Sequence, residues 1–261
     1  MTSTDAAHVR YAFADGIARI TLAAGDRGNP LHDTSTAELT DAVLRARADQ
    51  ARVIVLASTG RFFSVGGDLA AFAGADDSSR YIDDLADALH RVVSDLQRSP
   101  AVVVAAVQGA AAGAGFPLAA AADVVVAADT AVFALGYGKV GLSIDGGSSQ
   151  LVHSLGLHRT LALALLHDTL SAQEAHAAGL VARVVPAAEL ESCIDELAAR
   201  LAAGPAYAQA ATKRLVRDSA EAAPEARLRA EALSIRDRVA EPDGKEGVAA
   251  FLAKRPAVFG R

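Results

Sequence analysis

The sequence predicts an α/β fold followed by a helical C-terminal region. Two observations carry this prediction. Apolar runs of strand length, at residues 53–56, 102–107 and 124–127, alternate with segments of helical periodicity. Beyond residue 171 helical periodicity prevails. The 261 residues, 52% hydrophobic and 21% charged, have the composition of a packed globular protein that is long enough to bury a large core.

The N-terminal elements follow one another in a regular order. Residues 9–13 and 17–22 are rich in β-formers on either side of Asp15-Gly16, a strong turn dipeptide, so they predict a hairpin. A helix over residues 35–48 leads to the strand at 53–56, and a second helix over 81–96 leads to the strand at 102–107. A helix of small residues then precedes the strand at 124–127.

The C-terminal part contains one further strand pattern, at residues 182–185. Helical periodicity covers residues 189–202, 206–218 and 224–239, with breaks at Gly204-Pro205 and at residues 222–224. We therefore expect a core formed by residues 1–200 and a helical region formed by residues 201–261.

Charge and composition argue against several classes of function. A formal net charge of -6 gives no reason to expect nucleic acid or an anionic membrane as partner, because both require concentrated basic surface. The single cysteine, Cys193, cannot form an intrachain disulfide, and no Cys/His cluster has the spacing of a metal site. No apolar run is suited to cross a bilayer, and the polar start lacks the apolar part of a secretory signal. These features predict a cytoplasmic protein without a bound metal.

Two glycine-rich turns follow buried strands. The first, at residues 61–69, reads Arg-Phe-Phe-Ser-Val-Gly-Gly-Asp-Leu, and its aspartate, Asp68, can cap the next helix. The second, at residues 108–118, reads Gln-Gly-Ala-Ala-Ala-Gly-Ala-Gly-Phe-Pro-Leu and lacks the glycine spacing of a dinucleotide-binding loop. Each turn alone is also compatible with a plain connection between strand and helix, although N–H groups at such a helix start favour an anion.

Together, in this order and spacing, the two turns resemble those of the crotonase family, the enoyl-CoA hydratases and isomerases, and the likeness runs from Arg27 to the tail at residues 246–260. The resemblance implies a crotonase-like ββα spiral core with a C-terminal helical oligomerisation region that assembles trimers or hexamers. It implies an acyl-CoA substrate, with coenzyme A as part of the substrate and no tightly bound cofactor. It also implies that the N–H groups of Gly67 and Ala114 form an oxyanion hole, which would stabilise charge on a thioester oxygen.

The sequence departs from the family where hydratases carry two catalytic glutamates, because Pro117 and Tyr137 occupy those positions. A different acid, Asp145, matches the aspartate of some family isomerases and of the aryl-CoA dehalogenase branch. A single carboxylate suffices to move a proton between two carbons. The alternative interpretation of Asp145 is the N-cap of a short helix that begins near residue 146.

Further positions are assigned by the same likeness. His90 lies where the dehalogenase branch has a pocket histidine, although a partly buried or surface histidine is the plainer interpretation. Tyr137 is expected to form a pocket wall or a catalytic hydrogen bond. Asp123 is expected to be structural. The positions expected to bind coenzyme A are Arg27, Ser64, Val65, Phe251 and Lys254.

The favoured function is that of an enoyl-CoA isomerase in which Asp145 shuttles a proton while Gly67 and Ala114 hold the enolate oxygen. Three alternatives remain open. They are a hydratase that positions water without the glutamates, a hydrolase or dehalogenase in which Asp145 attacks the ring of the acyl group and His90 activates water, and a CoA-ligand binding protein without catalysis. An Asp145 that points away from the oxyanion hole would favour the last.

Overall fold

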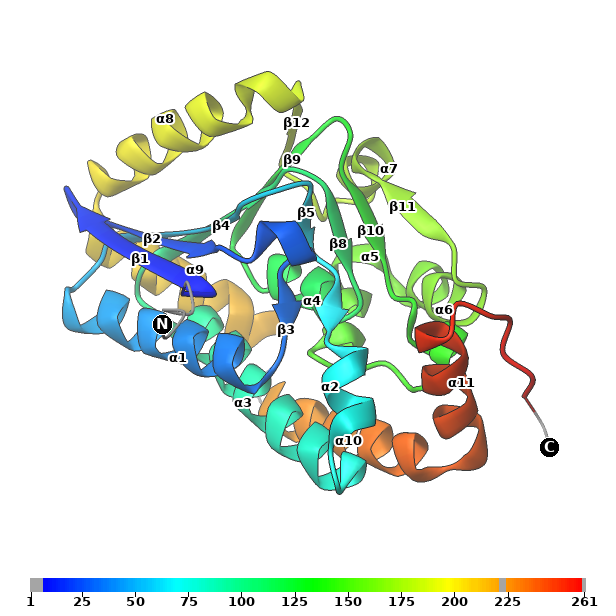
Figure 1. Ribbon diagram of the computed structural model, residues 1–261. Coiled ribbons are helices and arrows are strands. Elements are labelled where there is room, and N and C mark those ends of the chain that lie inside the picture. The colour runs from blue at the N-terminus through cyan, green and yellow to red at the C-terminus, as the bar shows by residue number, and fades with distance from the viewer. Residues whose placement is uncertain (1–6, 221–223, 260–261) are drawn as a thin grey trace.

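The computed structural model describes residues 7–220 and 224–259, which are built around a six-stranded sheet of order β1-β2-β4-β7-β9-β12 (Figure 1). Strands β1 and β2 form the antiparallel hairpin predicted around Asp15-Gly16, and every later neighbour in this sheet pairs in parallel. The strands are β1 (Val9–Ala14), β2 (Ile17–Leu22), β4 (Val53–Ser58), β7 (Val102–Val107), β9 (Val124–Ala128) and β12 (Arg183–Val185).

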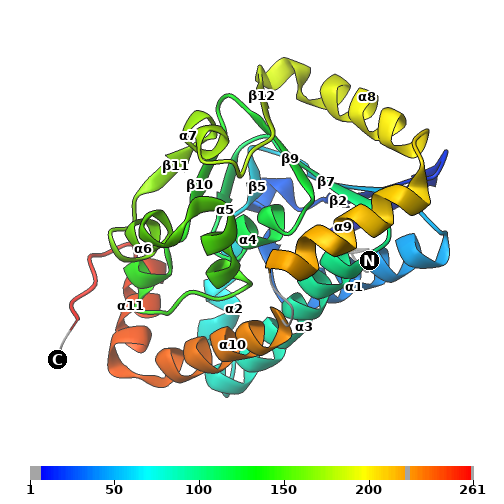
Figure 2. The ribbon, with the colours of Figure 1, turned by 180° about the vertical axis from the view of Figure 1, so that it is seen from behind.

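Helices cover both faces of this sheet, which explains why its central strands are apolar throughout (Figures 1 and 2). On one face α8 (Leu190–Ala202) packs Ile194 and Leu197 against Val104 of β7. The other face is covered by α1 (Asp33–Ala48), α3 (Ser78–Arg98) and α4 (Gly115–Ala120). All six residues of β7 are buried as a result.

A second set of short strands lies beside the main sheet and was not predicted. It comprises the four-stranded sheet β11-β10-β8-β5 and the pair β3-β6. After each of the long strands β4, β7 and β9 the chain forms short strands of this set, two after β4 and one each after β7 and β9, and then a helix or helical turn. This repetition is the ββα spiral. The strands are β3 (Pro30–Leu31), β5 (Phe62–Ser64), β6 (Gly66–Gly67), β8 (Ala110–Ala112), β10 (Val132–Ala134) and β11 (Thr169–Ser171).

The remaining helices lie mainly in the second half of the chain. They are α2 (Leu69–Gly74), α5 (Val152–Leu155), α6 (Leu157–Leu165), α7 (Ala172–Ala177), α9 (Ala206–Ala220), α10 (Pro224–Ala240) and α11 (Pro242–Leu252), with 3-10 turns η1 (Gly25–Arg27), η2 (Tyr137–Val140), η3 (Ser148–Leu151) and η4 (Ala187–Glu189). Among the described residues no helix has the length and hydrophobicity needed to cross a membrane.

Helix α10 runs along α3, as both ribbon views show (Figures 1 and 2). Ile235 and Val239 of α10 join a buried cluster that includes Ile82 of α3 and Phe72 of α2. The C-terminal helices therefore complete the interior around the first 200 residues. The division at residue 200 stays a prediction.

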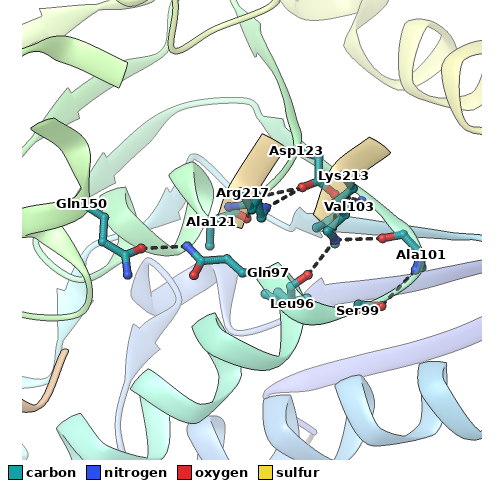
Figure 3. A network of polar contacts seen from close by, with 10 residues as sticks. All are labelled: Leu96, Gln97, Ser99, Ala101, Val103, Ala121, Asp123, Gln150, Lys213 and Arg217. Atoms are coloured by element: carbon teal, nitrogen blue, oxygen red, sulfur yellow. Dashed lines mark hydrogen bonds and ion pairs between the residues drawn. The ribbon is translucent and has the colours of Figure 1, made fainter. Parts of the chain in front are cut away.

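Helix α9 is held mainly by polar contacts to the end of α3 and the start of β9 (Figure 3). Asp123 pairs with Lys213 at 2.8 Å and with Arg217 at 2.7 Å. Lys213 also donates to the main-chain oxygens of Leu96 and Ala101. Burial lowers the pKa of Lys213, while the neighbouring Asp123 opposes that shift. These contacts agree with the structural role expected for Asp123.

Candidate functional site

A cavity of about 700 Å³ brings together four of the residues singled out in the sequence, Gly67, Ala114, Tyr137 and Asp145. Its volume and predominantly apolar lining suit a small organic ligand. The apolar walls include Leu69, Phe72, Ile82, Leu85, Leu89, Val140, Leu142 and Ile235.

The two glycine-rich turns meet at one edge of this cavity. Gly66 has a φ of +87°, and a Cβ atom at that position would lie 2.7 Å from the main-chain oxygen of Ala112 and 3.0 Å from the nitrogen of Ala114. Only glycine permits such a close approach of the two backbones at this φ. The sequence of the first turn therefore places its backbone directly against the second.

The N–H of Gly67 is directed away from its partner strand. In the ladder between β6 and β3 the next residue, Asp68, donates to the main-chain oxygen of Leu31 at 2.9 Å. Because alternate residues of a parallel strand bond to a given neighbour, the N–H of Gly67 faces away from β3. Gly67 itself lines the cavity.

Ala114 precedes the first residue of α4, where helices have N–H groups without an internal partner. Within residues 7–220 and 224–259, no acceptor takes the N–H of Ala114. Ala114 lines the same cavity as Gly67. Gly67 and Ala114 thus line the same cavity, and the convergence of their N–H groups on one oxygen, as an oxyanion hole requires, stays a prediction.

Asp145 lies on the cavity with only 6% of its surface exposed. The helix that follows, η3, begins at Ser148, and its N-cap is Gly147, without a side-chain cap. The interpretation of Asp145 as an N-cap is therefore wrong. The physical reason is the turn at Gly146 and Gly147, whose φ values of +70° and +93° separate the carboxylate from the helix start.

His90 is buried beside Asp145, so the interpretation as a partly buried or surface histidine is wrong. Its Nε2 lies 2.9 Å from Oδ1 of Asp145, and both side chains are less than 10% exposed. Neither atom has a directed hydrogen bond to the described residues, so the two side chains are in close contact without a formed hydrogen bond.

Glu231 of α10, which the sequence analysis did not identify, organises the Asp145 loop. Its Oε2 accepts from the N–H groups of Gly147 at 2.7 Å and Ser148 at 3.1 Å, and its Oε1 accepts from the N–H of Ser149 at 2.8 Å. Burial raises the pKa of Glu231, and the charge of Asp145 adds to the increase. The available signal was a glutamate on the buried face of an amphipathic helix, since Leu228, Ala232 and Ile235 of that face are buried.

The ligand atoms of His90, Asp145 and Glu231 lie within 4.8 Å of one another, a spacing that one cation could bridge. However, the Glu231 oxygens already accept three backbone N–H donors, and those donors would oppose a cation at the same oxygens. We therefore assign no metal ion to this cluster.

The two positions that hold glutamates in family hydratases shape the Asp145 loop. The hydroxyl of Tyr137 donates to the main-chain oxygen of Asp145 at 2.9 Å. Burial raises the pKa of Tyr137, and the Asp145 charge raises it further, so the phenol stays a donor. Pro117 packs beneath the loop, because a Cβ at Gly146 would lie 3.4 Å from Pro117 Cγ.

Three of the five positions expected to bind coenzyme A, Arg27, Val65 and Phe251, line the cavity. Ser64 is fully buried, donates to the main-chain oxygen of Asn29 and accepts from the N–H of Gly66. Its hydroxyl therefore supports the first turn and is not placed to contact a ligand. The contact of Lys254 stays a prediction. The cavity also includes two cations that were not predicted, Lys139 and Arg255.

Comparisons with known proteins agree with these features. The family described as enoyl-CoA hydratase/isomerase matches residues 12–261. A probable enoyl-CoA hydratase of Rhodobacter capsulatus is 38% identical over 252 residues, covering 96% of this chain and 97% of that protein. The 1,2-epoxyphenylacetyl-CoA isomerase of Escherichia coli is 33% identical and covers 94% of this chain and 95% of its own. The crystal structure of an enoyl-CoA hydratase from Mycobacterium avium subsp. paratuberculosis, 34% identical, superposes with a TM-score of 0.89 and covers 98% of this chain and 99% of that one.

Proposed function

The chain belongs to the enoyl-CoA hydratase/isomerase family, and from that premise we propose that it is an enoyl-CoA isomerase whose base is Asp145. The observation that carries the proposal is the shared cavity, in which one buried carboxylate faces the same space as the two backbone donors Gly67 and Ala114. Pro117 and Tyr137 offer no second carboxylate for the hydration of a double bond.

The proposed reaction moves one proton. The thioester oxygen accepts hydrogen bonds from Gly67 and Ala114, and Asp145 removes the α-proton of a 3-enoyl-CoA. The electron pair of the broken C–H bond delocalises onto that oxygen as a dienolate. Asp145 then returns the proton to the γ-carbon, which gives the conjugated 2-enoyl-CoA. Loss of one such backbone donor typically costs about 3–4 kcal/mol of transition-state stabilisation.

The apolar walls and the cations of the cavity support an acyl-CoA ligand. Leu85, Leu89 and Ile235 offer an apolar surface for an acyl chain. Arg27, Lys139 and Arg255 provide positive charge that suits the phosphates of coenzyme A. Arg255 is already paired with Glu246 at 2.7 Å, so a phosphate there would compete with a carboxylate.

The test is a panel of three substrate classes at equal concentration. If the proposal is right, the protein converts a 3-enoyl-CoA to the 2-enoyl isomer. The conversion is measured by the absorbance of the conjugated thioester. Hydration of a 2-enoyl-CoA should be slower by at least about 100-fold, because the paired carboxylates are missing. Efficient hydration without isomerisation would contradict the proposal.

A second candidate function rests on the His90 contact. If Asp145 attacks an aromatic carbon that carries a halide, the halide leaves and an aryl ester of Asp145 forms. Water deprotonated by His90 would then attack the carboxyl carbon of that ester and release the hydroxyaryl-CoA. The 2.9 Å contact places His90 beside the carboxylate that such a step requires. Halide release from a 4-halobenzoyl-CoA in the same panel would favour this candidate over the isomerase.

A further inference from the structure

His90 connects Asp145 to a second cavity. It contacts Asp145, which lines the acyl cavity, and itself lines a second, smaller cavity of about 270 Å³ between α3 and α10. Ser94 and Asp95 of α3 and Glu225 and Arg229 of α10 line this second cavity. Its volume and polar lining allow it to hold several water molecules.

We propose that His90 relays protons between Asp145 and water in the cavity between α3 and α10. The proposal rests on the isomerase function, because it gives the proton held by Asp145 a second destination. The proton passes from Oδ1 of Asp145 to Nε2 of His90, and the imidazolium releases the proton of its other ring nitrogen to water. By the reverse steps a proton from water returns through His90 to Asp145, which then protonates the γ-carbon of the dienolate. A small rotation of the ring would convert the 2.9 Å contact into a directed hydrogen bond.

The lining of the second cavity favours such an exit. Ser94 Oγ donates to Glu225 Oε1 at 2.9 Å, and Asp87 forms an ion pair with Arg91 at the same cavity. Carboxylates and a hydroxyl beside an imidazole can carry a proton onward through water. The acyl cavity would be filled by substrate during turnover, so the second cavity provides a route that does not compete with the ligand.

The relay predicts that the isomerised product acquires deuterium from D2O. Ser94→Phe fills the second cavity from α3 and should lower the deuterium content of the product at least about threefold while kcat changes less than about twofold. Ser192→Phe, at an exposed serine of α8, is the matched control and should leave both quantities unchanged. Asp95→Trp is a second variant that closes the cavity, in case Ser94→Phe does not fold.

A second measurement does not depend on turnover. The Cε1–H of each histidine exchanges slowly with D2O when the imidazole is reached by solvent, and mass spectrometry resolves the rate for each histidine. With a saturated acyl-CoA in the acyl cavity, the exchange of His90 should persist in the wild-type protein. In Ser94→Phe it should decrease at least about threefold.

The two measurements separate the relay from the isomerase function. If 3-enoyl-CoA is not converted, the isomerase proposal is wrong, and the exchange of His90 still decides whether the second cavity reaches the imidazole. If the acyl-CoA alone stops the exchange, or if Ser94→Phe and Asp95→Trp leave it unchanged, the relay is wrong. Full deuterium incorporation by both closing variants would overturn it as well.

Discussion

Asp145 is fixed through its main chain, so its side chain remains free for chemistry. Its carbonyl oxygen accepts from Tyr137 and from Ser148 Oγ, whereas its carboxylate faces His90 and the cavity. Elsewhere on the cavity Asp68 has the opposite arrangement, because its carboxylate accepts from the N–H groups of Ala70 and Ala71 and caps α2. The two aspartates of this cavity therefore differ in role: Asp145 is the proposed catalytic base, and Asp68 caps a helix.

The first prediction compares these two aspartates. Asp145→Asn should lower 3-enoyl-CoA turnover at least about 100-fold, because an amide cannot accept the α-proton. Its melting temperature and CoA affinity should stay close to the wild-type values, since the amide keeps the shape. Asp68→Asn is the control and should retain activity, because Asn caps helices about as well as Asp. An active Asp145→Asn protein would remove this residue from the mechanism.

The second prediction concerns the raised pKa of Glu231. In the folded protein Glu231 holds a proton at pH values where the unfolded chain, with an ordinary pKa of 4.5, has lost it. The stabilisation from this proton is complete below pH 4.5 and is lost as the pH rises through the raised pKa. The unfolding free energy of wild type minus that of Glu231→Gln should therefore decrease between pH 4 and pH 7, measured by urea denaturation. A difference that increases over this interval would show that the assigned direction of the shift is wrong.

At the scale of elements, α9 depends on a buried charge cluster, whereas α10 depends on apolar packing. Asp123 balances both Lys213 and Arg217, and the side chain of Lys213 is only 6% exposed. Removal of one partner from a buried pair costs far more than removal of a surface pair, because a charge is left without compensation.

The third prediction follows from that difference. Asp123→Ala should lower the unfolding free energy by about 3–5 kcal/mol, because Lys213 and Arg217 of α9 lose their counter-charge. Arg229→Ala, which breaks the exposed pair of Arg229 with Asp83, is the control and should have little effect. Comparable losses in the two variants, measured by chemical denaturation, would show that the Asp123 cluster is no more important than a surface ion pair.

Long elements were predicted from the sequence more accurately than most short ones. Strand β7 was predicted with its observed bounds, and α3 within three residues at its start and two at its end, because each repeats its pattern over several turns or pleats. Strands β3 and β6 contain two residues each, which is too short for a period to be visible. They are instead defined by their pairing with each other, Pro30 beside Gly66 and Leu31 beside Gly67.

Site residues that belong to a local sequence motif were predicted, whereas a site residue contributed by a helix distant in the sequence was missed. Gly67, Ala114 and Asp145 lie within or next to recognisable turns, and all line the cavity. Glu231 reaches its partners across more than 80 positions of sequence, and no local pattern records that contact. The signal for Glu231 in the sequence was a charged residue on the apolar face of α10.

At the scale of the whole molecule, several large apolar side chains of the described chain are exposed, among them residues of α6 and α9. Leu157, Leu161 and Leu165 of α6 lie four residues apart, hence on one helix face, and are 58%, 43% and 70% exposed. On α9, Tyr207 is 95% exposed and Leu215 is 65% exposed. Apolar residues gathered in this way commonly mark contacts between protein chains.

The last prediction is that residues 201–261 assemble trimers. The wild-type protein at micromolar concentration should sediment at about 80 kDa, three times the 26.7 kDa of one chain, or at twice that value for paired trimers. Leu215→Glu places a charge in the proposed interface on α9 and should shift the protein towards single chains, because burial of an unpaired carboxylate is costly. Leu44→Glu, at an exposed leucine of α1, is the control and should leave the sedimentation unchanged. If wild type sediments as a single chain, trimer formation is wrong. If Leu215→Glu assembles as wild type does, assembly through α9 is wrong and the exposed leucines of α6 become the surface to test next.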